Sequence, residues 1–275
     1  MRRRLLRCFL ILAGLAAALI VFCYWTAIQD PVVRRLQVSA KPWPAGVRPV
    51  RLVLMSDLHV GGPDMPPRRL SRIVAQVNAL DPDIVLIAGD FITDKRLATR
   101  HYSHDEAIAP LAALRPRLAT VAVMGNHDHW RDGAAAHRAL ARAGIRVLDN
   151  QAVQVGPLAV GGLDDDWSHR ADVPATMAAL SRLTGPKIVL SHSPDPFPAL
   201  PSDVVLMAAG HTHCGQVAPP LVGPLSTMSH YGRRFACGVV REGGKILVVT
   251  AGLGTSGVPL RLGAVPDLWL IEIGR

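Results

Sequence analysis

Five apolar runs of this 275-residue chain are each followed by side chains that can bind a metal ion. Asp57 and His59 follow "VRLVLM", Asp90 follows "DIVLIAG", and "NHDH" follows "TVAVMG". His192 ends "KIVLSH", and "HTH" follows "DVVLMAAG". Ordinary turns favour Gly, Pro and Ser, so one such residue would be unremarkable turn chemistry. Five successive sites built from Asp, Asn and His indicate a shared function.

The candidate ligands mix imidazole nitrogens with carboxylate and amide oxygens. They are Asp57, His59, Asp90, Asn126, His192, His211 and His213. This mixture suits borderline divalent ions such as Mn, Fe, Co, Ni or Zn, and it is too rich in nitrogen for a dedicated Mg or Ca site. Seven ligands exceed the needs of one tetrahedral ion. We therefore expect two divalent ions, roughly 3.5–4 Å apart, that share a carboxylate.

The elements that must position these ligands are short strands alternating with helices. The apolar runs are rich in Val, Ile and Leu, as is typical of buried strands, and "KILVVTAG" and "DLWLIEI" add two more. Helices are predicted over 67–80, from Asp132 to Gly144, and over 174–185. Another helix is predicted to begin at Ser103, where Glu106 three residues later can complete a capping box. Such alternation predicts an α/β fold, in which ligand sites form beyond the carboxyl ends of strands. If Asp57 and His59 continue a strand, their side chains share one face.

In this order, "SDLH", "AGD", "GNHD", "LSH" and "GHTH" resemble the signature of the calcineurin-like metallophosphoesterases. The resemblance runs from about residue 50 to the C-terminus. "HCGQ" and "VTAGLGTSGVPLRLG" resemble a membrane-anchored bacterial branch of that family. This chain departs from the branch at Cys214, where Gly is usual, and at "VPD" (265–267), where Pro-Pro-Glu is usual.

The resemblance implies a fold and a division of the ligands. The fold would be α/β, with two mixed β-sheets packed as a sandwich, flanked by α-helices and preceded by one N-terminal transmembrane helix. One ion would be held by Asp57, His59 and His213, and the other by Asn126, His192 and His211. Asp90 would bridge the two ions.

The resemblance also implies hydrolysis by in-line attack of a metal-activated hydroxide. His127 would be the acid near the leaving group, and we expect Asp128 to fix its tautomer. His129, Arg233 and Arg234 are weaker candidates for substrate contacts. We expect Asp94 to cap or orient its loop, and "LDDDW" (163–167) to be a solvated acidic turn.

The leading hypothesis is a membrane-anchored dinuclear phosphoesterase that cleaves a phosphate ester or pyrophosphate of a small molecule or lipid-linked substrate. An alternative is a UDP-2,3-diacylglucosamine pyrophosphatase-type hydrolase of lipid A biosynthesis, which needs a cytoplasmic substrate. A non-enzymatic scaffold would have lost ligands, and none is missing. A nuclease is favoured only by the net charge of +9, and the arginines are scattered without interleaved aromatic residues. The sequence leaves the natural substrate and the oligomeric state open.

The N-terminus predicts a single membrane span. Cys8–Ile28 is almost wholly apolar and long enough to cross a bilayer. Four arginines precede it, at 2, 3, 4 and 7, and two follow it, at 34 and 35. Because the more basic flank of a span stays in the cytoplasm, we expect a cytoplasmic N-terminus and a periplasmic catalytic domain at the inner membrane. "RRRLLR" partly matches a twin-arginine export signal, but no A-x-A cleavage site follows. The expected organisation is an anchor over 1–28, a linker over 29–47 and a metallophosphoesterase domain over 48–275.

The four cysteines form no C-x-x-C motif, which argues against a zinc knuckle or thioredoxin-like site. Their pattern requires no disulfide and leaves a Cys214–Cys237 pair open. A free Cys214 beside His213 would alter the softness of the metal site or make it sensitive to oxidation.

Overall fold

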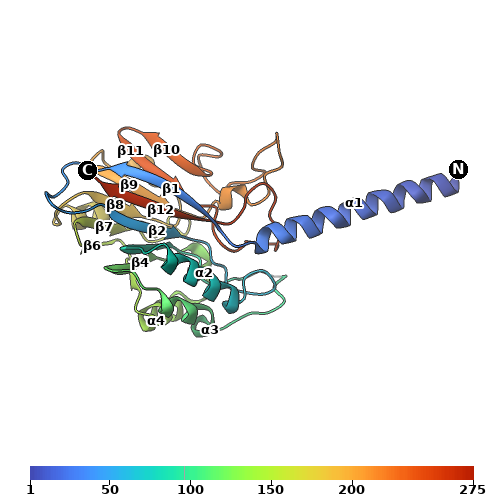
Figure 1. Ribbon diagram of the computed structural model, residues 1–275, viewed down its shortest axis with the longest axis horizontal. Helices are drawn as coiled ribbons and strands as arrows, with labels where there is room; N and C mark the ends of the chain where they lie inside the picture. Colours follow the sequence, from blue (N-terminus) through green and yellow to red (C-terminus); the bar gives the residue numbers. More distant parts are fainter. Residues whose placement is uncertain (96) are drawn as a thin grey trace.

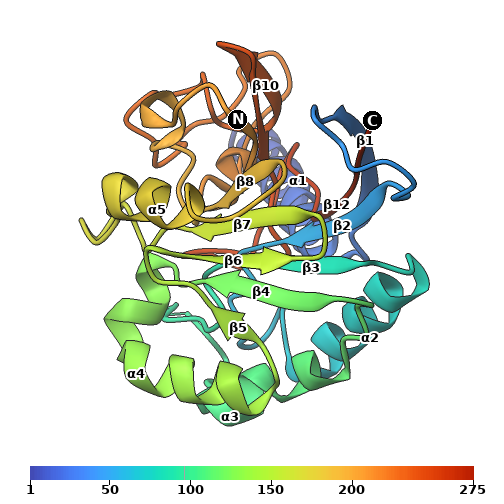
Figure 2. The same ribbon diagram turned by 90° about the vertical axis from the view of Figure 1, so that its left-hand side faces the viewer.

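All seven predicted strands form, and with five further strands they make two six-stranded mixed sheets that pack face to face (Figures 1 and 2). The computed structural model describes residues 1–95 and 97–275. The first sheet has the order β1-β12-β2-β3-β4-β5 and the second the order β10-β11-β9-β8-β7-β6. The strands are β1 Val32–Ser39, β2 Val50–Met55, β3 Ile84–Ala88, β4 Ala119–Val123, β5 Arg146–Val147, β6 Gln151–Val155, β7 Leu158–Gly162, β8 Lys187–Leu190, β9 Val204–Ala209, β10 Gly238–Glu242, β11 Lys245–Val249 and β12 Asp267–Gly274.

Both faces of the first sheet are buried, which explains why its central strands are apolar throughout. Along β2, Leu52 and Leu54 pack into the core between the two sheets. Val53 and Met55 point the other way and pack with helix residues such as Leu70. A third cluster lies on the outer face of the second sheet. The layers are therefore helix, sheet, sheet and helix, as the family resemblance implied.

Helices cover the two outer faces. Figure 2 shows α2, α3 and α4 below the first sheet and α5 beside the second. Their bounds are α2 Pro67–Ala79, α3 His104–Ile108, α4 Asn126–Arg142 and α5 Val173–Leu180, and short 3₁₀ helices span Ala109–Ala113 (η1), Phe197–Ala199 (η2) and His213–Gly215 (η3).

Two of the helix predictions hold closely and two need correction. The α2 bounds match to one residue, and the Ser103–Glu106 capping box is present. Helix α4 begins at Asn126, six residues before the predicted Asp132, because "NHDHW" forms a helical turn of its own. Asp132 still caps the second part, since its Oδ1 accepts the Ala135 N–H at 2.9 Å. Helix α5 ends at Leu180 rather than near Gly185.

The segment expected as a linker, 29–47, contains strand β1. This strand pairs in parallel with β12 along its whole length, from Val32 beside Asp267 to Ser39 beside Gly274. Most of its residues are exposed because it forms the edge of the sheet, so the segment carries little of the apolar signal that marks a buried strand. β5, β6, β7 and β10 were also not predicted. Among them, β7 is fully buried but contains two glycines, which weaken the strand pattern.

Helix α1, Arg2–Ile28, extends away from the sheets (Figure 1). By length and composition it can cross a bilayer. Only Cys23, Thr26 and Ala27 are buried in it, all near its end at the sheets. There the Arg261 N–H donates to the Cys23 carbonyl at 3.0 Å, and the Arg69 guanidinium donates to the Gln29 carbonyl at 2.6 Å.

Candidate metal centre

The seven predicted ligands converge beyond the carboxyl ends of strands from both sheets. The turns that carry them have an unusual backbone, because Asp57, His59, Asp90, His211 and His213 all have φ between +43° and +67°. That left-handed region is uncommon for residues other than glycine, and non-glycine residues held there concentrate at functional sites. Asp57 and His59 therefore converge through two left-handed turns after β2, and not through the strand alternation expected from the sequence.

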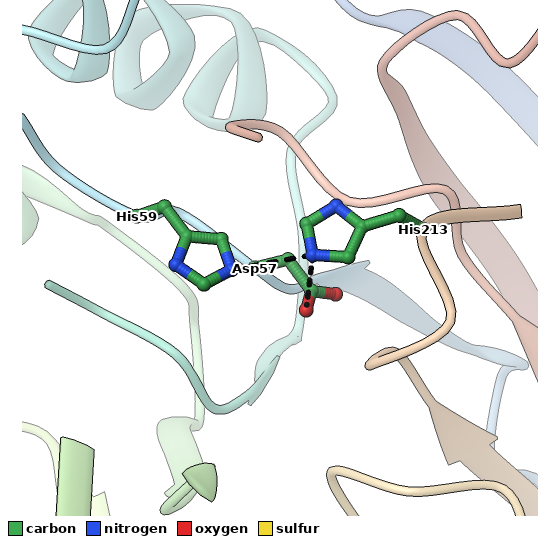
Figure 3. A group of neighbouring side chains, drawn as sticks. All are labelled: Asp57, His59 and His213. Atoms are coloured by element: carbon green, nitrogen blue, oxygen red, sulfur yellow. Dashed lines mark hydrogen bonds and ion pairs between the residues drawn. The ribbon is translucent and has the colours of Figure 1, made fainter. Parts of the chain in front are cut away.

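The first group is Asp57, His59 and His213, whose side chains point toward one another in Figure 3. The Nε2 atoms of His59 and His213 are 3.2 Å apart, and His213 Nε2 is 3.3 Å from Asp57 Oδ1. All three side chains are buried. One carboxylate and two imidazoles at these separations can share one divalent ion.

The second group is Asn126, His192 and His211. His192 Nε2 is 3.1 Å from Asn126 Oδ1 and 3.1 Å from His211 Nδ1. The tautomers of both imidazoles follow from their other nitrogens, because a carbonyl can only accept. His192 Nδ1 donates to the Ala88 carbonyl at 2.7 Å, and His211 Nε2 donates to the Met228 carbonyl at 3.0 Å. In its neutral form each ring thus turns an unprotonated nitrogen toward the group, as a metal ligand requires. Burial lowers the pKa of His192, but the Asp90 and Asp57 carboxylates outweigh burial and raise this pKa well above its ordinary value, and a bound cation would favour the neutral ring.

Asp90 lies between the two groups. Its Oδ2 is 3.4 Å from His59 Nε2 and 3.3 Å from His192 Nε2, while its Oδ1 accepts the His127 N–H at 3.0 Å. A carboxylate in this position can contact an ion in each group. This arrangement agrees with the bridging role that the resemblance implied.

Glycines allow the ligand turns to approach so closely. A Cβ on Gly125 would lie 2.2 Å from Asp90 Oδ1, and one on Gly210 would lie 1.9 Å from Ser56 Oγ and 2.5 Å from Asp57 Oδ2. No larger residue fits at either position without moving a candidate ligand.

The electrostatics of the cluster fit divalent cations. Burial lowers the pKa of the His211 imidazole to about 3 and keeps the pKa of His59 and of His213 well below the ordinary value, so all three rings are neutral and have a free lone pair. Burial also raises the pKa of the Asp57 carboxyl to about 6. Within the described residues, Asp57 Oδ1 is buried without a hydrogen-bond donor. A cation would compensate this oxygen, and the mixed donor set suits a borderline metal.

His127 is oriented by Asp94 and not by the predicted Asp128. His127 Nδ1 is 2.6 Å from Asp94 Oδ1, and its Nε2 lies 4.0 Å from Asp90 Oδ2. Burial lowers the pKa of His127, but the Asp90 and Asp94 carboxylates outweigh burial and raise this pKa above its ordinary value. Asp128 instead accepts the backbone N–H groups of Asp90, Phe91 and Gly125, at 2.8–3.0 Å. It holds two ligand turns together, and its role is positional.

A cavity of about 340 Å³ opens onto the cluster. It is lined in part by His127, Trp130, His211, Gln216, Met228 and Ser256. Trp130 was not singled out from the sequence, although it follows His127 by three residues on the same helical turn. Its ring centroid lies 4.9 Å from that of His127.

The three weaker candidates for substrate contacts have polar partners away from the ligand cluster. His129 Nε2 is 2.7 Å from Asp164 Oδ1, Arg234 pairs with Glu242, and Arg233 donates to the Pro224 carbonyl at 3.3 Å. None of the three is among the cavity-lining residues in the described part of the chain. The expectation that "LDDDW" is a solvated turn is wrong: Asp165 is fully buried, and the Trp167 ring lies 5.1 Å from that of His211.

Cys214 forms a disulfide with Cys237. The bond closes the loop that follows His213, and it removes the free thiol that would have altered the metal site. Cys8 and Cys23 are free.

Comparison with known proteins agrees with this geometry. Residues 50–215 match the family model described as calcineurin-like phosphoesterase. The Bacillus subtilis "Uncharacterized metallophosphoesterase YkuE" is 31% identical over 84% of this chain and 81% of its own length. The Escherichia coli "Phosphodiesterase YaeI" is 31% identical, with 82% of each chain covered.

Animal proteins are similar as well, so the likeness is not confined to a bacterial branch. The Danio rerio "Transmembrane protein with metallophosphoesterase domain" is 32% identical over 92% of this chain, and this chain spans 60% of its length. It spans 57% of the Bos taurus protein of the same name. Together, the matched family model and these relatives show that the chain belongs to the calcineurin-like phosphoesterase family.

Proposed function

We propose that this chain is a membrane-anchored phosphoesterase that depends on two divalent metal ions held by Asp57, His59 and His213 and by Asn126, His192 and His211. Family membership makes the chain a metallophosphoesterase, a hydrolase that acts on phosphoesters. The observation that carries the dinuclear proposal is Asp90, whose Oδ2 lies within 3.4 Å of an imidazole nitrogen of each group.

Two divalent ions would supply charge to phosphate oxygens and lower the pKa of a water at the site. The residues of this chain do the rest. His127 directs Nε2 toward the cluster while Asp94 holds Nδ1, so the ring can pass a proton from Nε2 to the departing oxygen. Trp130 and Met228 give the cavity an apolar wall that can hold the alcohol part of the ester.

We further propose that residues 1–28 span the membrane once and that the catalytic domain, including β1, lies outside the cytoplasm. The excess of arginines before the span supports this orientation. So does the Cys214–Cys237 disulfide, because disulfides persist in oxidising compartments and are rare in the cytosol. The same disulfide weighs against the UDP-2,3-diacylglucosamine alternative, which requires a cytoplasmic substrate.

The full-length chain, purified in detergent, tests the dinuclear proposal. We expect two equivalents of divalent metal by elemental analysis and hydrolysis of at least one class in a panel of phosphomonoesters, phosphodiesters and pyrophosphates. Removing the metal with a chelator should abolish the activity. Asp90→Ala should lose both metal and activity, because two cations without the bridging carboxylate repel each other.

Asp105→Ala is the matched control, since Asp105 is an exposed carboxylate paired with Arg142 away from the cluster. It should keep both metal equivalents. Full activity in metal-free wild-type protein, or normal metal content in Asp90→Ala, would contradict the proposal.

A further inference from the structure

A group of large apolar side chains is exposed beside the cavity. Leu221 is fully exposed, and Val222, Leu225 and Met228 are 53%, 63% and 50% exposed. All lie in residues 219–234, here called the lip, which the Cys214–Cys237 disulfide encloses. Clustered exposed apolar residues mark a contact with a protein or a membrane. Met228 belongs both to the lip and to the cavity wall, so whatever covers the lip lies at the mouth of the site.

The lip lies on the side of the domain from which α1 leaves. The Cys23 carbonyl near the end of α1 accepts the Arg261 N–H at 3.0 Å, and the next residue, Leu262, accepts the Ala218 N–H at 2.7 Å. Ala218 immediately precedes the lip. In Figure 1 the orange loop between β9 and β10 projects on the same side as α1.

The end of α1 indicates where the bilayer surface lies. Phe22 and Trp25 are 51% and 55% exposed, whereas Cys23 and Ala27 are buried against the domain. Tyr24 donates from its hydroxyl to the Pro63 carbonyl at 3.5 Å. Tyr and Trp are typical of the interface between head groups and hydrocarbon. The domain therefore meets the membrane surface at the contacts that connect α1 to the lip.

The charge of the lip also fits a membrane. Residues 213–241 contain no Asp or Glu, while they include Arg233, Arg234 and Arg241. Glu242 neutralises Arg234, which leaves Arg233 as the exposed cation of the lip. Apolar side chains flanked by basic ones are typical of segments that lie in the head-group layer of anionic membranes.

We propose that the lip inserts Leu221, Val222 and Leu225 into the head-group layer of the bilayer that α1 spans. The cavity then opens at the level of the lipid head groups, and the phosphoester that enters it is borne by a membrane lipid. The choice of substrate rests on the phosphoesterase function proposed above, whereas the insertion itself does not.

Fluorescence quenching in nanodiscs tests the insertion with the full chain. In a Cys8→Ser, Cys23→Ala background, one protein carries Leu221→Cys and the other Leu118→Cys, each labelled with an environment-sensitive dye. Leu118 is the matched control, because it is an apolar residue, 49% exposed, that precedes β4 at the opposite end of the first sheet. The discs contain phosphatidylethanolamine and phosphatidylglycerol with nitroxide-labelled acyl chains. We expect the nitroxide to quench the dye at 221 and leave the dye at 118 unaffected.

A second measurement separates the insertion from the activity. Leu221→Ser with Leu225→Ser should slow hydrolysis of a phosphoester lipid in the disc by about tenfold, because buried apolar area is lost. Hydrolysis of a water-soluble ester should be unchanged. Equal quenching at 221 and 118, or a dye at 221 that only an aqueous quencher reaches, would overturn the lip proposal. A metal-loaded wild type that hydrolyses neither ester would overturn the proposed function while leaving the quenching result intact.

Discussion

At the scale of single residues, the structure assigns the partner of His127 differently from the sequence. Asp128 is adjacent in the motif, yet its two oxygens accept three backbone N–H groups. Asp94, 33 residues earlier, reaches His127 Nδ1. A spacing of this kind has no local sequence signature, since it depends on how the loop after β3 folds over α4. The family motif predicts that His127 is the acid, and the fold places Asp94 beside its Nδ1.

The first prediction concerns His127. His127→Gln should keep the metal content, because His127 is not needed in either group of three ligands. If the imidazole protonates the leaving oxygen, hydrolysis of alkyl esters should fall by about 10²–10⁴-fold, and hydrolysis of nitrophenyl esters much less. Rates for both ester classes, with elemental analysis of the same preparation, check this.

His137→Gln is the control for that change. His137 lies on the same helix as His127 but near the surface, and it also pairs with an aspartate, since its Nε2 is 2.7 Å from Asp149 Oδ2. It should leave both rates unchanged. Equal losses on the two ester classes with metal retained would show that His127 stabilises charge or positions substrate. Loss of metal would make it a structural support of the site.

At the scale of elements, strand ends were predictable and turn geometry was not. Apolar runs such as "VRLVLM" identify buried strands, and the carboxyl ends of strands from both sheets bring Asp57, Asp90 and His192 together. Periodicity says nothing of the left-handed backbone at Asp57 and His59, which the close packing of the turns imposes. It also misses β1, because an edge strand needs no apolar face and gains its stability from pairing with β12.

The second prediction tests how tightly the turns are packed. Gly210→Ala should displace Asp57, since the new Cβ would lie 2.5 Å from Asp57 Oδ2. We expect loss of metal with only moderate destabilisation, about 1–3 kcal/mol, the usual cost of overpacking. Thermal unfolding and elemental analysis of the same sample measure the two effects.

Gly144→Ala provides the comparison. Gly144 has φ of +75° after the end of α4, and nothing lies within 4 Å of its added Cβ. This variant should lose about 1 kcal/mol of stability through backbone strain while keeping its metal. Metal loss of similar size in both variants would mean that general destabilisation, and not the collision with Asp57, empties the site.

At the scale of the whole molecule, α1, the Cys214–Cys237 disulfide and the candidate metal centre are connected. The end of α1 is bound to Arg261, whose guanidinium donates to the carbonyls of Ala251 and Ala264 and lies 3.4 Å from His213 Nδ1. The disulfide begins at Cys214, the next residue. Buried polar contacts therefore join the end of α1 to the turn that carries His213, which supports the proposal that the site works at the membrane surface.

The third prediction concerns orientation, on which the choice of substrate depends. The charge bias across α1 and the disulfide both predict that the C-terminus lies outside the cytoplasm. Fusing β-lactamase to the C-terminus should confer ampicillin resistance on the host, because that enzyme protects cells only after export. A green fluorescent protein at the same point should stay dark when exported through the general secretory route. Deleting residues 1–28 should reverse both signals, which controls for the reporters.

A fluorescent, ampicillin-sensitive fusion would contradict this orientation. Cys214 and Cys237 would then lie in a reducing compartment, and cytoplasmic nucleotide-linked lipids could reach the cavity. Membrane insertion of the lip would still be expected, because the lip and α1 leave the domain on the same side whichever leaflet they face.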